Sequence, residues 1–271
     1  LAAAPHILWY FSALILVYAT LVRLLRKRWA MLGTYILASL PLYLMHGIVP
    51  YADAFMSVHV FMAIMYLFAS TTTEHSAAFL RLSALATGLL IFTKNEALLL
   101  YLPPLLFLLV ATLLIRRTNR KELLRTLGQY GVCIAIIALP WLLYKVNNGL
   151  PFGNAKPIGD TQLVWQPNVF LSILINTFLE GNWIFLYVLL FTLLIVCYKK
   201  AFRSSLLILT SFCLVVYGAQ MFLFLFTGLS TEALRQTGQA RGLIQLTPVI
   251  VVLVTVLLED LWRRLHKNET S

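Results

Sequence analysis

Charged residues are scarce in this sequence, and acids are scarcer than bases. Asp, Glu, Lys and Arg make up 11% of the 271 residues, whereas soluble domains carry about 25%. The three cysteines, Cys133, Cys197 and Cys213, fall within apolar runs and show neither disulfide nor metal-ligand spacing. These shortages exclude a soluble globular domain and a fold held by disulfides or by cysteine-bound metal.

Sequence motifs of several enzyme classes are also missing. The chain has no glycine-rich phosphate loop, no HExxH, no GxSxG and no CxxC. His46 and His59 lie within apolar runs and have no metal-ligand partner at i+3 or i+4, so we expect them to be satisfied core histidines. The chemistry of this chain therefore has to come from another arrangement of side chains.

Long apolar runs are what the sequence does have. Hydrophobic residues make up 61% of it, and the mean hydropathy is +0.86. A helix needs about 20 apolar residues to cross about 30 Å of hydrocarbon, and the runs are continuous rather than alternating, which favours helices over a barrel. We predict an all-α, polytopic transmembrane bundle in which residues 1–271 form a single transmembrane domain. The nine expected spans are Ile7–Leu25, Met31–Val49, Ala54–Ala69, Ala77–Phe92, Ala97–Ile115, Thr126–Tyr144, Trp183–Tyr198, Leu206–Thr227 and Leu243–Leu258.

Three of these runs are expected to be irregular. Pro41 softens the second span, and Pro103-Pro104 should kink or break the fifth because prolines cannot donate to the helix ladder. The apolar stretch 169–198 would be about 45 Å long as one helix, too long for an upright span. We expect Val169–Leu179 to lie in the membrane interface, with a corner at Gly181-Asn182.

The positions of the basic residues predict the topology. With alternating loops, 16 of the 21 Lys and Arg fall on one side of the membrane when Arg81 is counted with its nearest loop. This excess marks the cytoplasmic side. The other side holds only five bases, Lys94, Lys145, Lys156, Arg235 and Arg241. It also holds five acids, Asp53, Glu96, Asp160, Glu180 and Glu232. Five acids and five bases leave this side near neutrality, so the positive-inside rule does not explain these charges. A polar pocket at the outer surface would explain them.

Asp53, Lys94, Glu96 and Arg241 are the candidate site residues. Asp53 begins a helix, where it can be a cap, a catalytic or ligand-binding acid, or both. Lys94 and Glu96 sit at the tip of a helical hairpin, where they can simply pair with each other. Arg241 precedes the final expected span, and it can anchor that helix at the interface or present a planar fork to a phosphate.

Several short motifs resemble the GT-C glycosyltransferases that use lipid-phosphate sugars. They are Tyr51-Ala52-Asp53, Phe92-Thr93-Lys94-Asn95-Glu96-Ala97-Leu98, Pro140-Trp141 with Asn148-Gly149-Leu150-Pro151-Phe152, and Ala240-Arg241 with Pro248. The nearest resemblance is to the protein O-mannosyltransferase-like and aminoarabinose-transferase-like group. It covers nearly the whole chain.

This resemblance implies transfer of a sugar from a polyprenyl-phosphate donor, with inversion, to a glycan, lipid or protein acceptor at the outer face. It implies that Asp53 matches a second essential acid, so that Asp53 is the expected catalytic residue. Lys94 and Arg241 match phosphate-contacting positions, and Glu96 orients Lys94 or contacts the acceptor. The family's first helix and its large outer loop, with the principal catalytic aspartate, have no counterpart here, so we expect a truncated glycosyltransferase, whose activity as it stands is left open. A divalent metal is left open, and a multi-pass protein of a bacterial plasma membrane is expected.

Two other function classes compete with this interpretation. Broken helices at Pro41 and Pro103-Pro104 would suit a transporter or permease, although the sequence shows no internal repeat of spans. A non-catalytic membrane scaffold would make the outer acids simple caps. The net charge of +11 does not indicate binding to nucleic acid, because the Lys and Arg residues lie in short clusters between apolar runs.

Overall fold

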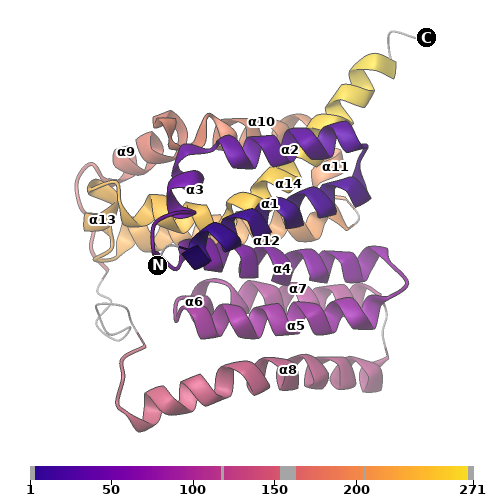
Figure 1. Ribbon diagram of the computed structural model, residues 1–271, viewed down its shortest axis with the longest axis vertical. Coiled ribbons are helices and arrows are strands. Elements are labelled where there is room, and N and C mark those ends of the chain that lie inside the picture. Colours follow the sequence, from indigo (N-terminus) through magenta and orange to yellow (C-terminus); the bar gives the residue numbers. More distant parts are fainter. Residues whose placement is uncertain (1–3, 117–118, 153–162, 204, 268–271) are drawn as a thin grey trace.

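The computed structural model describes residues 4–116, 119–152, 163–203 and 205–267, and these form a layered bundle of helices (Figure 1). Apart from a single bridge between Leu163 and Thr227, no strand pairing occurs in this part of the chain. The prediction of an all-α polytopic bundle is therefore confirmed. The helices of the first half are α1 (Ala4–Leu24), α2 (Lys27–Ser39), α3 (Pro41–His46), α4 (Asp53–Thr72), α5 (Ser76–Thr93), α6 (Ala97–Leu100), α7 (Leu102–Ile115) and α8 (Arg120–Asn147). Those of the second half are α9 (Val169–Leu174), η2 (Ile175–Leu179), η3 (Gly181–Trp183), α10 (Leu186–Val196), α11 (Tyr198–Ala201), α12 (Leu206–Phe226), α13 (Ser230–Leu234) and α14 (Gly238–Lys267).

The number of long helices is smaller than the nine predicted spans. The described residues contain seven helices long and apolar enough to cross a membrane, or eight if the bent pair around α10 counts as one. The difference lies in the second predicted span, which is split into α2 and α3 at Leu40 because Pro41 begins a new helix. Together α2 and α3 still cross the bundle in the direction opposite to α1. Trp29, at the start of α2, packs on Trp262 near the end of α14, and His46, at the end of α3, lies beside Asp53 at the opposite end of the bundle. The alternation of ends that the charge argument used is thus kept.

The expected irregularities occur close to where the sequence placed them. The helix before Pro103-Pro104 stops at Leu100, and Tyr101 separates α6 from α7. The segment from Val169 to Trp183 meets α10 at an angle of 109°, so the predicted corner is present. Several boundaries were wrong. The sixth span begins at Arg120 rather than Thr126. The last helix begins at Gly238 and ends at Lys267, which puts Arg241 inside it rather than in a loop.

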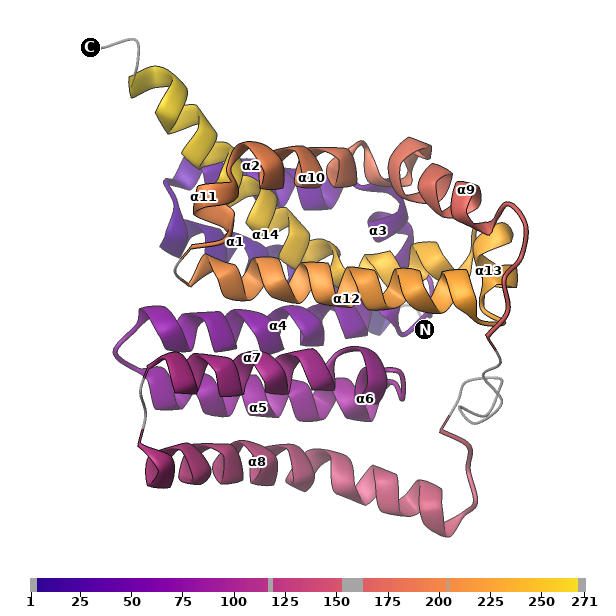
Figure 2. The ribbon, with the colours of Figure 1, turned by 180° about the vertical axis from the view of Figure 1, so that it is seen from behind.

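Helix α14 is the centre of the bundle. Its apolar middle is almost entirely buried, and it contacts α1, α2, α4, α10 and α12. In contrast, α8 is mostly exposed and lies at the edge of the bundle against α5 and α7 (Figure 2). The central position of α14 brings the last part of the sequence against α4 from the first part, and this contact builds the site described next.

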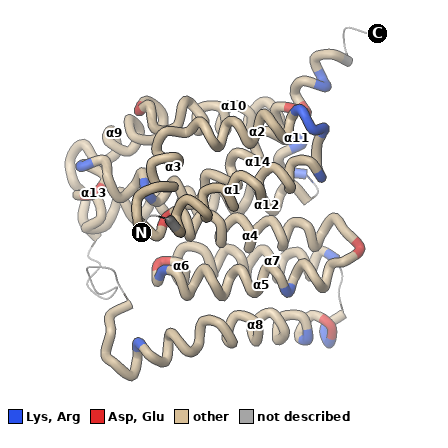
Figure 3. The backbone as a smooth tube through the Cα atoms, in the orientation of Figure 1, with Lys and Arg blue, Asp and Glu red and all other residues tan. Residues whose placement is uncertain are grey.

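Lys and Arg are concentrated at one end of the bundle (Figure 3). This end, called the basic end below, holds the α1–α2 corner, the start of α8, α11 and the last turns of α14. The opposite end, called the Asp53 end, holds the start of α4, the α5–α6 tip and the start of α14.

Candidate functional site

Asp53 and Lys94 are brought together by the antiparallel packing of α4 and α5. Asp53 is the first residue of α4, and Lys94 follows the last residue of α5. Because the two helices pack along their full length, these ends meet. Lys94 Nζ lies 3.1 Å from Asp53 Oδ1 and 2.9 Å from Glu96 Oε1. The two carboxylates therefore share one ammonium group.

Arg241 completes the cluster from the other end of the sequence. Its Nε donates to Asp53 Oδ2 at 2.8 Å, and its guanidinium carbon lies 4.5 Å from the centre of the Tyr51 ring. The four residues predicted from the sequence, Asp53, Lys94, Glu96 and Arg241, thus lie in one connected group. Of the other acids expected on this side, Glu180 accepts from Asn182 instead, and Asp160 lies outside the described residues.

Asp53 serves this cluster rather than the helix terminus. Its side chain makes no capping hydrogen bond in α4, for which Ala52 is the cap position. Both of its oxygens are occupied, since Gln245 Nε2 also donates to Oδ1 at 3.1 Å. The side chain has 0% exposure, whereas those of Lys94, Glu96 and Arg241 are 17%, 26% and 39% exposed. A buried carboxylate needs such partners, because an unpaired charge away from water is very costly.

Arg241 is held at one edge of its fork and is 39% exposed. Its Nε is bound to Asp53 and its plane is supported by Tyr51, while within the described part of the chain the two Nη atoms make no hydrogen bond. Arginine binds phosphate oxygens with paired N–H groups. The arrangement therefore leaves the two Nη groups of Arg241 available to an anion, near the ammonium of Lys94.

A buried hydrogen-bond network connects the cluster to the interior of the bundle. Gln245 donates to Glu96 Oε1 at 2.6 Å as well as to Asp53, and its own oxygen accepts from the Tyr101 hydroxyl at 2.5 Å. Gln220 donates to that hydroxyl at 3.2 Å and to the carbonyl of Gly242 at 3.1 Å. The amide of Gln245 thus ties both carboxylates to the middle of the bundle.

Sequence reasoning missed these supporting residues. Gln245 could have been found, because it is four residues after Arg241 and so shares its helix face. Tyr101 and Gln220 gave no signal, since each lies within an apolar run. His46 is buried as expected, but the expectation that it is satisfied was wrong. It lies at the site, and its buried Nδ1 has no hydrogen-bond partner among the described residues, since Asp53 Oδ2 is 3.6 Å away, beyond hydrogen-bond distance. His59 instead meets the Thr93 hydroxyl at 3.2 Å.

The metal-binding capacity of the site depends on how many ligating side chains surround its two carboxylates, Asp53 and Glu96. Among the residues that the structure describes, no group of three or more His, Cys, Asp and Glu is placed to hold an ion. The oxygens of Asp53 are already engaged by Lys94, Arg241 and Gln245.

This geometry can be compared with known families. A sequence profile of the dolichyl-phosphate-mannose-protein mannosyltransferase family matches residues 2–144, just over half of the chain. The chain belongs to this family. The mannosyltransferase match includes Asp53, Lys94, Glu96 and Tyr101 but ends before Gln220, Arg241 and Gln245. Comparisons with curated proteins and with solved structures find no match.

Membership of the mannosyltransferase family decides between the function classes left open by the sequence. The family is one of membrane glycosyltransferases of the GT-C type, so the resemblance drawn from the short motifs is confirmed at the family level. The seven long apolar helices fit a multi-pass membrane protein of this kind. The permease and scaffold alternatives have no comparable support.

Replacing Gln245 by leucine is expected to destabilise the protein. The change leaves the Tyr101 hydroxyl without its acceptor and takes a donor from both Asp53 and Glu96. A buried polar group that loses its partner costs about 1–3 kcal/mol, so the midpoint of thermal unfolding in detergent should fall. Gln129→Leu, the same substitution at an exposed position of α8, is the control and should leave the midpoint nearly unchanged. Equal midpoints for the two variants would contradict a stabilising role of the hydrogen-bond network around Gln245.

Proposed function

We propose that this protein transfers a sugar from a polyprenyl-phosphate donor to an acceptor hydroxyl at the non-cytoplasmic face of a membrane, with inversion. The observation that carries the proposal is the meeting of Asp53, Lys94, Glu96 and Arg241 at one end of an apolar bundle. A donor of this class needs its phosphate and sugar at a polar surface while its chain stays in lipid. The Asp53 end offers such a surface, and the concentration of bases at the opposite end is the reason to place the Asp53 end outside.

The donor phosphate is assigned to Arg241 and Lys94. The Nη atoms of Arg241 and the ammonium of Lys94 would contact phosphate oxygens. When the bond between the anomeric carbon and the phosphate oxygen breaks, the lipid phosphate leaves with the electron pair and gains negative charge. Fixed cations beside that oxygen stabilise the transition state more than the ground state.

The acceptor hydroxyl attacks the anomeric carbon from the side opposite to the phosphate and gives its proton to a carboxylate. Glu96 is the more exposed of the two carboxylates, which favours it as the one that contacts the acceptor. The catalytic role expected of Asp53 stays a prediction. Its burial and its three donors favour a positioning role, in which it holds the two phosphate-binding cations at a fixed separation. A positioned base contributes about 10²–10⁴-fold in rate.

The proposal is tested with the full chain in lipid nanodiscs and synthetic polyprenyl-phosphate mannose labelled in the sugar. Two quantities are measured, the binding of this donor and the release of polyprenyl phosphate when delipidated membrane proteins or a lipid extract are added as acceptor source. We expect micromolar binding and acceptor-dependent release, with product of inverted configuration. Absence of donor binding would overturn the phosphate site. Binding without release in either mixture would overturn the transfer activity but leave the phosphate site standing.

A further inference from the structure

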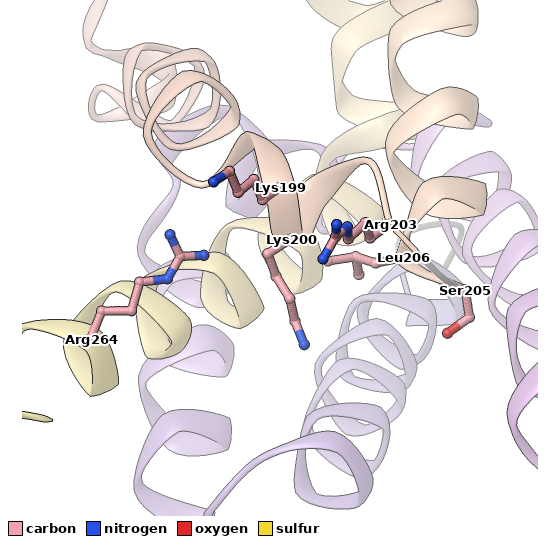
Figure 4. A pocket seen from close by; sticks show the side chains of 6 residues that line it. All are labelled: Lys199, Lys200, Arg203, Ser205, Leu206 and Arg264. Carbon is pink, nitrogen blue, oxygen red and sulfur yellow. The ribbon is translucent and has the colours of Figure 1, made fainter.

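A second polar site lies at the basic end, away from the cluster around Asp53. A hollow of about 380 Å³ is lined by Lys199, Lys200, Arg203, Ser205, Leu206 and Arg264 (Figure 4). Leu206 is 14 residues before Gln220, which touches the Asp53 network, so the two sites are about 21 Å apart along α12. The hollow is therefore not an extension of the donor site.

The residues of the hollow come from three packed segments. Lys199 and Lys200 belong to α11, Arg203 lies in the connection to α12, and Arg264 lies on α14, which α11 contacts. The volume falls in the range of about 300–1,000 Å³ that small-ligand sites occupy. The positive-inside rule accounts for bases at this end, but it does not account for four of them around one concavity.

The hollow carries an excess of positive charge. Arg264 pairs with Asp260 and Arg263 pairs with Glu259, both along α14. Among the described residues, no carboxylate pairs with Lys199, Lys200 or Arg203. About three positive charges are thus left to an anion, and Lys and Arg around a small hollow favour phosphate oxygens.

The surroundings distinguish a lipid from a free anion. Ile195, Tyr198 and Phe202, next to the hollow in the sequence, are exposed large apolar side chains, with exposures of 75%, 56% and 45%. Apolar side chains beside a basic hollow suit a molecule that has both a phosphate and hydrocarbon chains. We propose that the hollow formed by Lys199, Lys200, Arg203 and Arg264 binds the phosphate headgroup of an anionic phospholipid in the leaflet at the basic end.

The test uses the purified full chain in a neutral detergent and calorimetric titration at low salt. The probe is dihexanoyl phosphatidic acid, compared with inorganic phosphate and with the zwitterionic dihexanoyl phosphatidylcholine. The hollow variant is Lys199→Gln, Lys200→Gln, Arg203→Gln. Its matched control is Arg26→Gln, Lys27→Gln, Arg28→Gln, which removes three exposed charges at the same end but outside the hollow.

We expect phosphatidic acid to bind the wild-type chain and the control variant alike, and to bind the hollow variant about 100-fold more weakly. The size follows from about fivefold per Lys or Arg beside an anionic lipid. Equal weakening in both triple variants would overturn the site, because it would reduce the effect to general surface charge. Inorganic phosphate binding as tightly as phosphatidic acid would overturn the lipid assignment. Because the donor site also takes phosphate, the titration is repeated with Arg241→Gln. Affinity lost in that variant rather than in the hollow variant would place the lipid at the Asp53 end and overturn the proposal.

Discussion

Asp53→Asn is expected to reduce glycosyl transfer at least 100-fold in a chain that still folds. The amide keeps the shape of the side chain but removes the charge that holds Lys94 and Arg241 together. The two cations then repel each other, and their separation no longer fits one phosphate group. The readout is the release of polyprenyl phosphate from the labelled donor, with the wild type assayed in parallel.

Stability has to be separated from chemistry in this experiment. Removing one partner of a buried ion pair costs about 3–5 kcal/mol, so the unfolding midpoint of Asp53→Asn should fall as well. The double variant Asp53→Asn, Arg241→Gln removes the unpaired cation, and it should recover part of the midpoint without recovering transfer. Asp260→Asn breaks an ion pair at the basic end and serves as the control for the substitution itself. Unchanged turnover in folded Asp53→Asn would remove Asp53 from the site.

Arg241→Gln is expected to raise the apparent KM for the lipid donor about tenfold or more. The glutamine keeps a polar group near Asp53 but lacks the paired Nη donors that we assign to the phosphate. Lys94→Ala should act in the same direction, because it removes the second cation of the site. Donor concentration is varied at fixed acceptor source, so that KM and kcat are obtained separately.

Arg235→Gln provides the matched comparison for Arg241→Gln. Arg235 is exposed, lies at the same end of the bundle and precedes the same helix, but it makes no contact with Asp53. Its replacement should leave KM within about twofold, since a surface charge contributes little. If the variants at 94, 235 and 241 all kept the wild-type affinity for the donor, Arg241 and Lys94 would not be its phosphate ligands.

The sequence predicted the fold well where long apolar runs are separated by short polar segments. Runs of about 20 apolar residues predicted most of the helices, and Pro103-Pro104 marked the break near Tyr101. Pro41 was underestimated. We expected a proline in the middle of the predicted run only to soften that span, whereas the chain begins a separate helix at Pro41. Some helices extend beyond the predicted apolar runs, as α14 does at Gly238. A polar first turn can continue an apolar helix, and a hydropathy pattern does not show such a turn.

The candidate site was predicted from its charges but not from its supports. Four ionisable side chains on the poorly charged side of an apolar chain are conspicuous, and all four lie together. The amides and the hydroxyl beneath them carry no charge and occur within apolar runs, so nothing in the pattern separates Gln220 from an ordinary helix residue. These residues support the site because their helices pack against one another, and the periodicity of a single sequence does not show which helices will be neighbours.

The bond between Asp53 and Arg241 joins positions 188 residues apart in the chain. The carboxylate enters the membrane with the early helices, long before its second counter-ion has been synthesised. Until α14 inserts, Lys94 is the one cation of the final trio that Asp53 can meet. A chain that ends before residue 241 therefore has the carboxylate of Asp53 without the guanidinium of Arg241, and the proposed donor site is completed only by the last helix.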